Sequence, residues 1–153
     1  MKINTTVVAG LMALTLSGAV LAKDALILTG ETGARGTAVA LDFSSSGAAT
    51  AFEFRIAVAE GDKATVDLSG CLKGLPSTHT GQCAFAKGSV IGIVYSDTNA
   101  LLPKGMLSLG TIGISSKARP AVTLLVVSDA QGGKLPSSVE LGSEAIENKR
   151  AAQ

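Results

Sequence analysis

The sequence predicts an all-β fold, an antiparallel β-sandwich of the jelly-roll or immunoglobulin-like kind. Three observations predict it. Short runs with apolar residues at alternate positions recur along the chain, Gly, Ser, Asp, Asn and Pro separate these runs, and the chain has 18 Gly, four Phe, one Tyr and no Trp. About eight or nine short strands at such regular spacing are typical of two stacked antiparallel sheets. A closed barrel is the alternative, because spacing alone does not distinguish closure from stacking.

The N-terminus has the pattern of a secretory signal peptide. Lys2 precedes an apolar run from Val7 to Leu16, and small residues follow as far as Ala22. This order predicts that residues 1–22 are cleaved near Ala22 and that the mature chain is secreted or periplasmic. No later stretch reaches the ~18 consecutive apolar residues that a membrane span needs, so we expect no span in the mature chain.

Three strands are predicted in the first part of the mature chain. Ala25–Thr29 is a short apolar opening, and a glycine-rich turn leads to Thr37–Phe43, where alternate residues are apolar. The clearest strand is Ala51–Val58, in which Phe52 and Phe54 begin an apolar face that alternates with polar and small residues. Such alternation predicts one buried face and one solvated face.

Five further strands are predicted after this point. In the most regular of them, Ile93 and Tyr95 fall on one face, whereas Val90 and Val94 fall on the other. Turn residues separate the strands, among them Pro and Gly in the segment before the longest one. The five predicted strands are Thr65–Leu68, Ser89–Ser96, Met106–Ile114, Val122–Val127 and Val139–Leu141.

The length of the chain limits the number of domains, and its charge limits the classes of partner. A chain of this length buries a core of its own, so residues 23–142 are predicted to form one domain and residues 143–153, which are polar, a frayed tail. The 13 basic and 12 acidic residues nearly cancel and form no charge run. This balance argues against a nucleic-acid partner, because nucleic-acid binding needs a basic patch.

The only two cysteines, Cys71 and Cys83, both lie in the mature chain. In an oxidising compartment this predicts a disulfide bond between them. A redox pair and a zinc site are the alternatives, but the first normally has C-x-x-C spacing and the second needs more ligands than one histidine adds. The loop between the cysteines, rich in Gly, Pro, Ser and Thr, is a candidate binding loop.

Three segments carry a resemblance to a known family. Phe52–Ile56 alternates aromatic or aliphatic residues with polar ones, Gly88–Ser96 is a β run introduced by glycine, and Leu102–Leu107 is a glycine turn entering a leucine-bearing strand. In this order they resemble the cohesin-like secreted β-sandwiches, which are related in shape to a group of carbohydrate-binding modules. The resemblance implies a sandwich fold and binding without catalysis. It does not imply a cellulosome, since the cystine loop is foreign to dockerin-binding cohesins.

The predicted function is protein recognition through a sandwich face or loop, by a module that is not an enzyme. The candidate binding surface is Glu53 and Arg55 on the outward side of their strand, Tyr95, and His79, which is predicted to be exposed in the cystine loop. The partner is an unknown extracytoplasmic protein. Polysaccharide binding is the alternative, although sugar-binding faces present exposed aromatic rings, and most aromatic residues here are predicted to face inward.

Catalysis and cofactors find little support in the sequence. A glycosidase needs two facing carboxylates, and the pattern brings no two of the acidic candidates together. A nucleophile motif of the G-x-S-x-G type is absent, so neither a catalytic histidine, a cofactor nor a metal ion is predicted. Whether edge strands pair two copies of the chain is left open. The acidic candidates are Asp42, Glu53, Asp62, Asp67 and Asp97.

Overall fold

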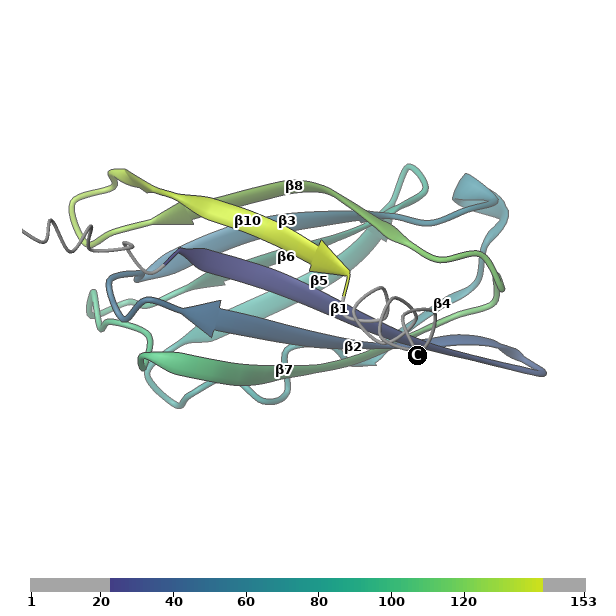
Figure 1. Cartoon of the computed structure of the whole chain (residues 1–153), viewed down its shortest axis with the longest axis horizontal. Coiled ribbons are helices and arrows are strands. Elements are labelled where there is room, and N and C mark those ends of the chain that lie inside the picture. The colour runs from purple at the N-terminus through teal and green to yellow at the C-terminus, as the bar shows by residue number, and fades with distance from the viewer. Residues whose placement is uncertain (1–22, 142–153) are drawn as a thin grey trace, which may run out of the picture.

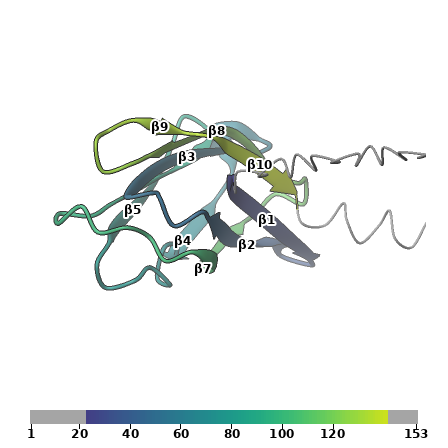
Figure 2. The ribbon, with the colours of Figure 1, turned by 60° about the vertical axis from the view of Figure 1, so that its left-hand side comes forward.

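The structure is a computed structural model that describes residues 23–141. The predicted signal peptide, residues 1–22, and the predicted tail, residues 143–153, lie outside the described residues. Within them the chain forms two five-stranded sheets that pack face to face (Figure 1, Figure 2). The predicted all-β sandwich is therefore confirmed. No helix in residues 23–141 has the length and apolar character needed to cross a membrane.

The two sheets are built from strands that are distant in sequence. Sheet A has the order β10-β1-β2-β7-β4, and sheet B has the order β5-β6-β3-β8-β9. A short 3-10 helix, η1 (Gly61–Lys63), follows β3. The strands are β1 (Asp24–Gly33), β2 (Gly36–Ser45), β3 (Ala51–Ala57), β4 (Val66–Gly70), β5 (Thr80–Ala86), β6 (Ser89–Tyr95), β7 (Gly105–Ile114), β8 (Ala121–Ser128), β9 (Lys134–Leu135) and β10 (Ser137–Leu141).

Two strands, β5 and β9, are not predicted by the sequence pattern, so the expected strand count is too low. Three of the seven residues of β5 are glycine or alanine, which have weak strand propensity. β5 forms because it pairs with β6 along its whole length, from Thr80 opposite Tyr95 to Ala86 opposite Ser89. β9 consists of two residues paired with the end of β8. The cystine loop is therefore shorter than expected, because β5 begins inside it.

β1 differs from the prediction in its length and in one of its partners. It pairs with β2 as far as Gly33 opposite Gly36, across the segment predicted as a glycine-rich turn. Gly36 has φ 128°, and a Cβ there would lie 2.1 Å from the carbonyl oxygen of Ile114, so only glycine fits. On its other side β1 pairs with β10 in parallel. The sandwich is thus antiparallel except at this edge.

The core lies between the two sheets and contains the inward residues of both. Phe43 of β2 stacks on Phe52 of β3 with ring centroids 4.4 Å apart and planes 5° apart. Phe52 in turn lies 6.3 Å from Phe54. All three rings are buried, as the alternation predicts. The stacked rings of Phe43 and Phe52 therefore pack sheet A against sheet B.

A glycine on β6 makes room for one of the two inward phenylalanines of β3. Gly92 lies directly opposite Phe54 in the ladder. A Cβ at Gly92 would lie 2.1 Å from Cζ of Phe54, so the ring occupies the space of the missing side chain. This close approach lets the phenyl ring lie against the inner surface of sheet B.

The predicted disulfide between Cys71 and Cys83 is present, with Cα atoms 6.4 Å apart. Cys71 follows the end of β4, an edge of sheet A, and Cys83 lies in the middle of β5, an edge of sheet B. The bond therefore ties the two sheets together along one side of the sandwich.

Candidate functional site

The candidate site is the outer face of sheet B. Residues there alternate with the buried ones, and cross-strand pairing assigns their neighbours. Ile93 of β6 lies opposite Glu53 of β3, and Glu53 lies opposite Val126 of β8. We define the sheet B face as Gln82, Ala84, Ile91, Ile93, Tyr95, Glu53, Arg55, Leu124 and Val126.

Apolar side chains form a strip along β6 on this face. Ile93 is 48% exposed and Tyr95 43% exposed, and both belong to the large hydrophobic residues that the described chain leaves most open. Ile91, two residues before Ile93, is half-buried on the same side. Single exposed apolar residues are common, but a run of three on one strand is a continuous apolar surface.

A second apolar strip lies across β3, on β8. Leu124 lies opposite Arg55, and Val126 lies opposite Glu53. Both are half-buried. Directly opposed residues in a sheet have Cβ atoms about 4.5–5.5 Å apart, so the β8 strip and the charged residues of β3 are in contact range. The two charged residues are therefore flanked by apolar side chains on both sides.

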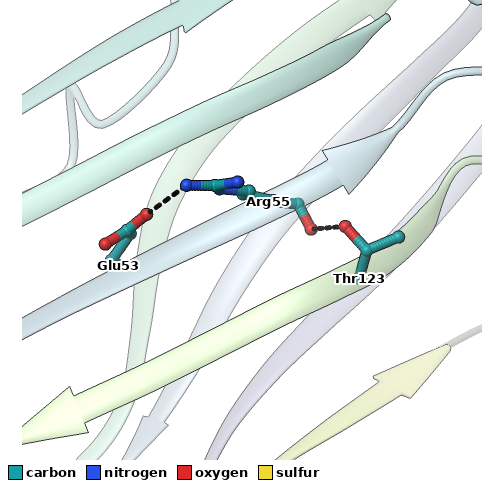
Figure 3. A network of polar contacts seen from close by, with 3 residues as sticks. All are labelled: Glu53, Arg55 and Thr123. Atoms are coloured by element: carbon teal, nitrogen blue, oxygen red, sulfur yellow. Dashed lines mark hydrogen bonds and ion pairs between the residues drawn. The ribbon is translucent and has the colours of Figure 1, made fainter. Parts of the chain in front are cut away.

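The charged residues of β3 pair with each other. Nη2 of Arg55 lies 3.3 Å from Oε1 of Glu53, with the side chains 51% and 37% exposed (Figure 3). Thr123 of β8 donates a hydrogen bond from Oγ1 to the carbonyl oxygen of Arg55, at 3.5 Å. An exposed pair of this kind contributes only ~0–1 kcal/mol to stability. Its main effect is to leave the sheet B face electrically neutral.

Three of the four residues of the predicted binding surface lie on one face, and the fourth does not. Glu53, Arg55 and Tyr95 share the sheet B face, on β3 and β6. His79 does not, because it is 7% exposed and lies just before β5. The prediction of an exposed His79 is therefore wrong. The loop after Cys71 folds back, with the His79 amide donating to the carbonyl of Pro76 at 3.0 Å, and this buries the imidazole.

The surroundings of His79 favour the neutral imidazole. Nδ1 lies 2.9 Å from Oγ1 of Thr78, and the buried Nε2 has no hydrogen-bond partner within the described residues. Burial lowers the pKa of His79 below its ordinary value, and the backbones of Ala100 and Thr50 oppose this shift in part. His79 therefore lies where the cystine loop meets the β2–β3 and β6–β7 loops, which is a structural position.

The outer face of sheet A holds an open trough of ≈ 650 Å³ near the β1–β2 turn. Two carboxylates line it, Glu31 on β1 and Asp67 on β4. These strands are three inter-strand spacings apart, about 14 Å, which is wider than the ~5–10 Å between paired glycosidase carboxylates. Hydrogen bonds from Ser69 lower the pKa of Asp67, so it is held ionised rather than ready to donate a proton.

The other acidic candidates lie on separate elements. Asp42 is on β2, Asp62 is in η1, and Asp97 is in the β6–β7 loop. Within residues 23–141, no three His, Cys, Asp or Glu side chains lie close enough together to hold a metal ion.

Comparison with known proteins identifies the fold. No protein-family model matches the chain, and no curated protein matches it. The structure is similar to a non-cellulosomal cohesin from the hyperthermophilic archaeon Archaeoglobus fulgidus, with TM-score 0.57 and 10% identity over 84% of this chain and 98% of that one. It is also similar to type II cohesin A11 from Bacteroides cellulosolvens, with TM-score 0.53 and 6% identity over 75% and 94%. The chain thus has a cohesin-like β-sandwich fold, as the resemblance implies.

Proposed function

We propose that this domain is a secreted, non-catalytic module that binds a protein partner through the sheet B face. The observation that carries the proposal is the pair of apolar strips on β6 and β8, which lie on either side of the neutral Glu53–Arg55 pair. Ile93 and Tyr95 are the anchors, because they are the most exposed apolar residues of these two strips. Desolvating such residues is what drives protein association.

The composition of the face fits a protein interface. The cores of protein interfaces are depleted in charged residues and enriched in aromatic ones, with polar groups at the rim. The sheet B face has one mutually neutralising ion pair, and Tyr95 ends its β6 strip with a hydroxyl that can hydrogen-bond at a rim. Small-molecule sites are instead concave, whereas this surface is the outer side of a sheet.

Polysaccharide binding has weaker support than protein binding. Sugar-binding faces stack pyranose rings on several exposed aromatic side chains. Here Phe43, Phe52 and Phe54 are buried in the core. Tyr95 is the one aromatic residue of the sheet B face, and a single ring does not make a stacking platform.

An extracytoplasmic location is part of the proposal. The sequence of residues 1–22 has the order of a signal peptide, and the Cys71–Cys83 disulfide needs an oxidising compartment to persist. The cohesin-like fold supports a binding role for the domain.

The test is a capture experiment with matched variants. The mature chain, residues 23–153, is immobilised and exposed to the culture fluid and envelope proteins of the source organism, beside a polysaccharide array. Ile93→Lys charges the centre of the sheet B face, and Thr111→Lys makes the same change at an exposed position on β7 of sheet A. We expect saturable capture of one protein by the unaltered chain and by Thr111→Lys, and its loss with Ile93→Lys. Sugar binding without a protein partner would contradict the proposal. So would capture of a protein that neither substitution weakens.

A further inference from the structure

A second interaction surface lies at the free edge of β5. Sheets A and B end in four edge strands, which are β10 and β4 in sheet A and β5 and β9 in sheet B. Each edge strand has backbone N–H and C=O groups directed away from the sheet, which another strand can pair with. We infer that β5 pairs with β5 of a second copy of this chain. This inference is independent of the function proposed for the sheet B face.

Three of the edges have features that hinder pairing. β4 carries Asp67, and its register shifts between Asp67 and Gly70. β9 has only two residues, one of them Lys134. β10 has five residues and directly follows Pro136. Charges, bulges, proline and short length are the devices by which edge strands avoid unwanted partners.

β5 has none of these devices. It is seven residues long, and no residue in it is charged or proline. Its register with β6 runs from Thr80 to Ala86 without a shift, so the strand is regular and its other edge is regular too. In the described part of the chain, its ladder partner is β6 alone.

The sequence of β5 is compatible with pairing to itself. A two-fold axis near Cys83 in an antiparallel pair sets Gln82 of one copy opposite Ala84 of the other, and Thr80 opposite Ala86. These outward residues are small or uncharged, so no like charges oppose one another. A two-fold arrangement also satisfies both copies with the same surface and closes the assembly at two.

The inner side of β5 has apolar area left to cover. Phe85 and Cys83 face the core but are only half-buried, whereas the inward residues Val90 and Val94 of the neighbouring strand β6 are completely buried. A second copy of β5 would shield them. Pairing would also join the two five-stranded B sheets into one and place the two sheet B faces side by side.

The experiment measures self-association of the mature chain by sedimentation velocity, from about 1 µM to about 1 mM, the range of weak and moderate protein complexes. Ala84→Lys places a charge on the outward side of β5, near the proposed two-fold axis. Ala38→Lys is the matched control, because it makes the same change at another exposed strand position, on β2 of sheet A. We expect a dimer whose dissociation constant rises at least about tenfold in Ala84→Lys and is unchanged in Ala38→Lys.

Hydrogen exchange gives a second readout that does not depend on a variant. We expect amides within residues 80–86 to exchange more slowly as the concentration of the unaltered chain rises, because pairing covers the free edge. A chain that stays monomeric throughout the range would overturn the inference. So would a dimer that persists in Ala84→Lys, or one whose residues 80–86 exchange at the same rate at every concentration.

Discussion

The two sheets share one core but present different outer faces. On sheet A, outward residues are mostly small or polar. The apolar exceptions, Ile27 and Met106, lie opposite Asp42 and Ser44 and so have polar neighbours across the ladder. On sheet B, apolar residues of β6 and β8 form two strips around one ion pair. The outward residues of the central sheet A strands include Ala38, Ala40, Asp42, Ser44, Thr111 and Gly113.

The inward residues of the two sheets determine stability, whereas the outward residues are the ones that can differ in their capacity to bind a partner. Both sheets need alternate apolar residues on their inner sides to build the core, so inward residues say nothing about which face binds. The outward residues contribute little to the stability of the fold. An apolar strip among them stays exposed to water, and burying it under a partner is favourable. The composition of the outward positions therefore favours sheet B over sheet A as the binding side that we propose.

We expect the largest effect on stability from a substitution in the core between the two sheets. Phe54→Ala removes a completely buried ring that fills the space over Gly92. We expect a loss of about 3–5 kcal/mol in the free energy of unfolding, measured by urea denaturation. Thr123→Ala, on the outer side of β8, is the control and should cost less than about 1 kcal/mol. Equal losses in the two variants would show that the inner and outer sides are not distinct.

The disulfide is the next test, since it ties the edge of sheet B to sheet A. Replacing Cys71 and Cys83 together by Ser opens a bridge between residues 12 apart in sequence. Loss of this constraint on the unfolded chain should cost ~3 kcal/mol, again by urea denaturation. Hydrogen exchange should increase in β5 more than in β2. An unchanged midpoint would contradict the role given to the bond.

The pH dependence of stability tests the burial of His79. Its pKa is lowered in the folded state from 6.5, so the unfolded chain takes up a proton first as the pH falls. The stability contributed by neutral His79 is therefore present above about pH 6.5 and is lost below it. Unfolding followed from pH 7.5 to pH 5 should show a decline that is reduced in His79→Gln. Asp67, whose pKa is lowered from 3.8, acts only at more acidic pH.

A decline of the same size in His79→Gln would show that the imidazole is not the group responsible.

The smallest effect on stability is expected at the Glu53–Arg55 pair. Glu53→Gln removes an exposed ion pair worth ~0–1 kcal/mol, so the unfolding midpoint should hardly move. The same change leaves Arg55 without its counter-charge on the sheet B face. We therefore expect a clear weakening of partner capture with little loss of stability. If capture is unaffected, the charged pair lies outside the contact area.

Sequence patterns predict the central strands correctly. They fail for β5 and for the burial of His79, which depend on contacts with segments distant in sequence. The alternation of β3 is local, so it correctly places Phe52 and Phe54 inside and Glu53 and Arg55 outside. The strand β5 has no such pattern, and it exists because β6 offers a ladder and Cys71 a covalent tie. His79 is buried by loops that contain Thr50 and Ala100, which are far from it in sequence.

We propose that the partner covers the outer face of sheet B. Amide chemical-shift mapping of the mature chain, titrated with the captured protein, tests it most directly. We expect shift changes and line broadening concentrated on β6, β3 and β8 around Ile93, Tyr95 and Arg55, with β2 and the centre of β7 unperturbed. Perturbation centred on the outer face of sheet A, around Ala40 and Thr111, would contradict it.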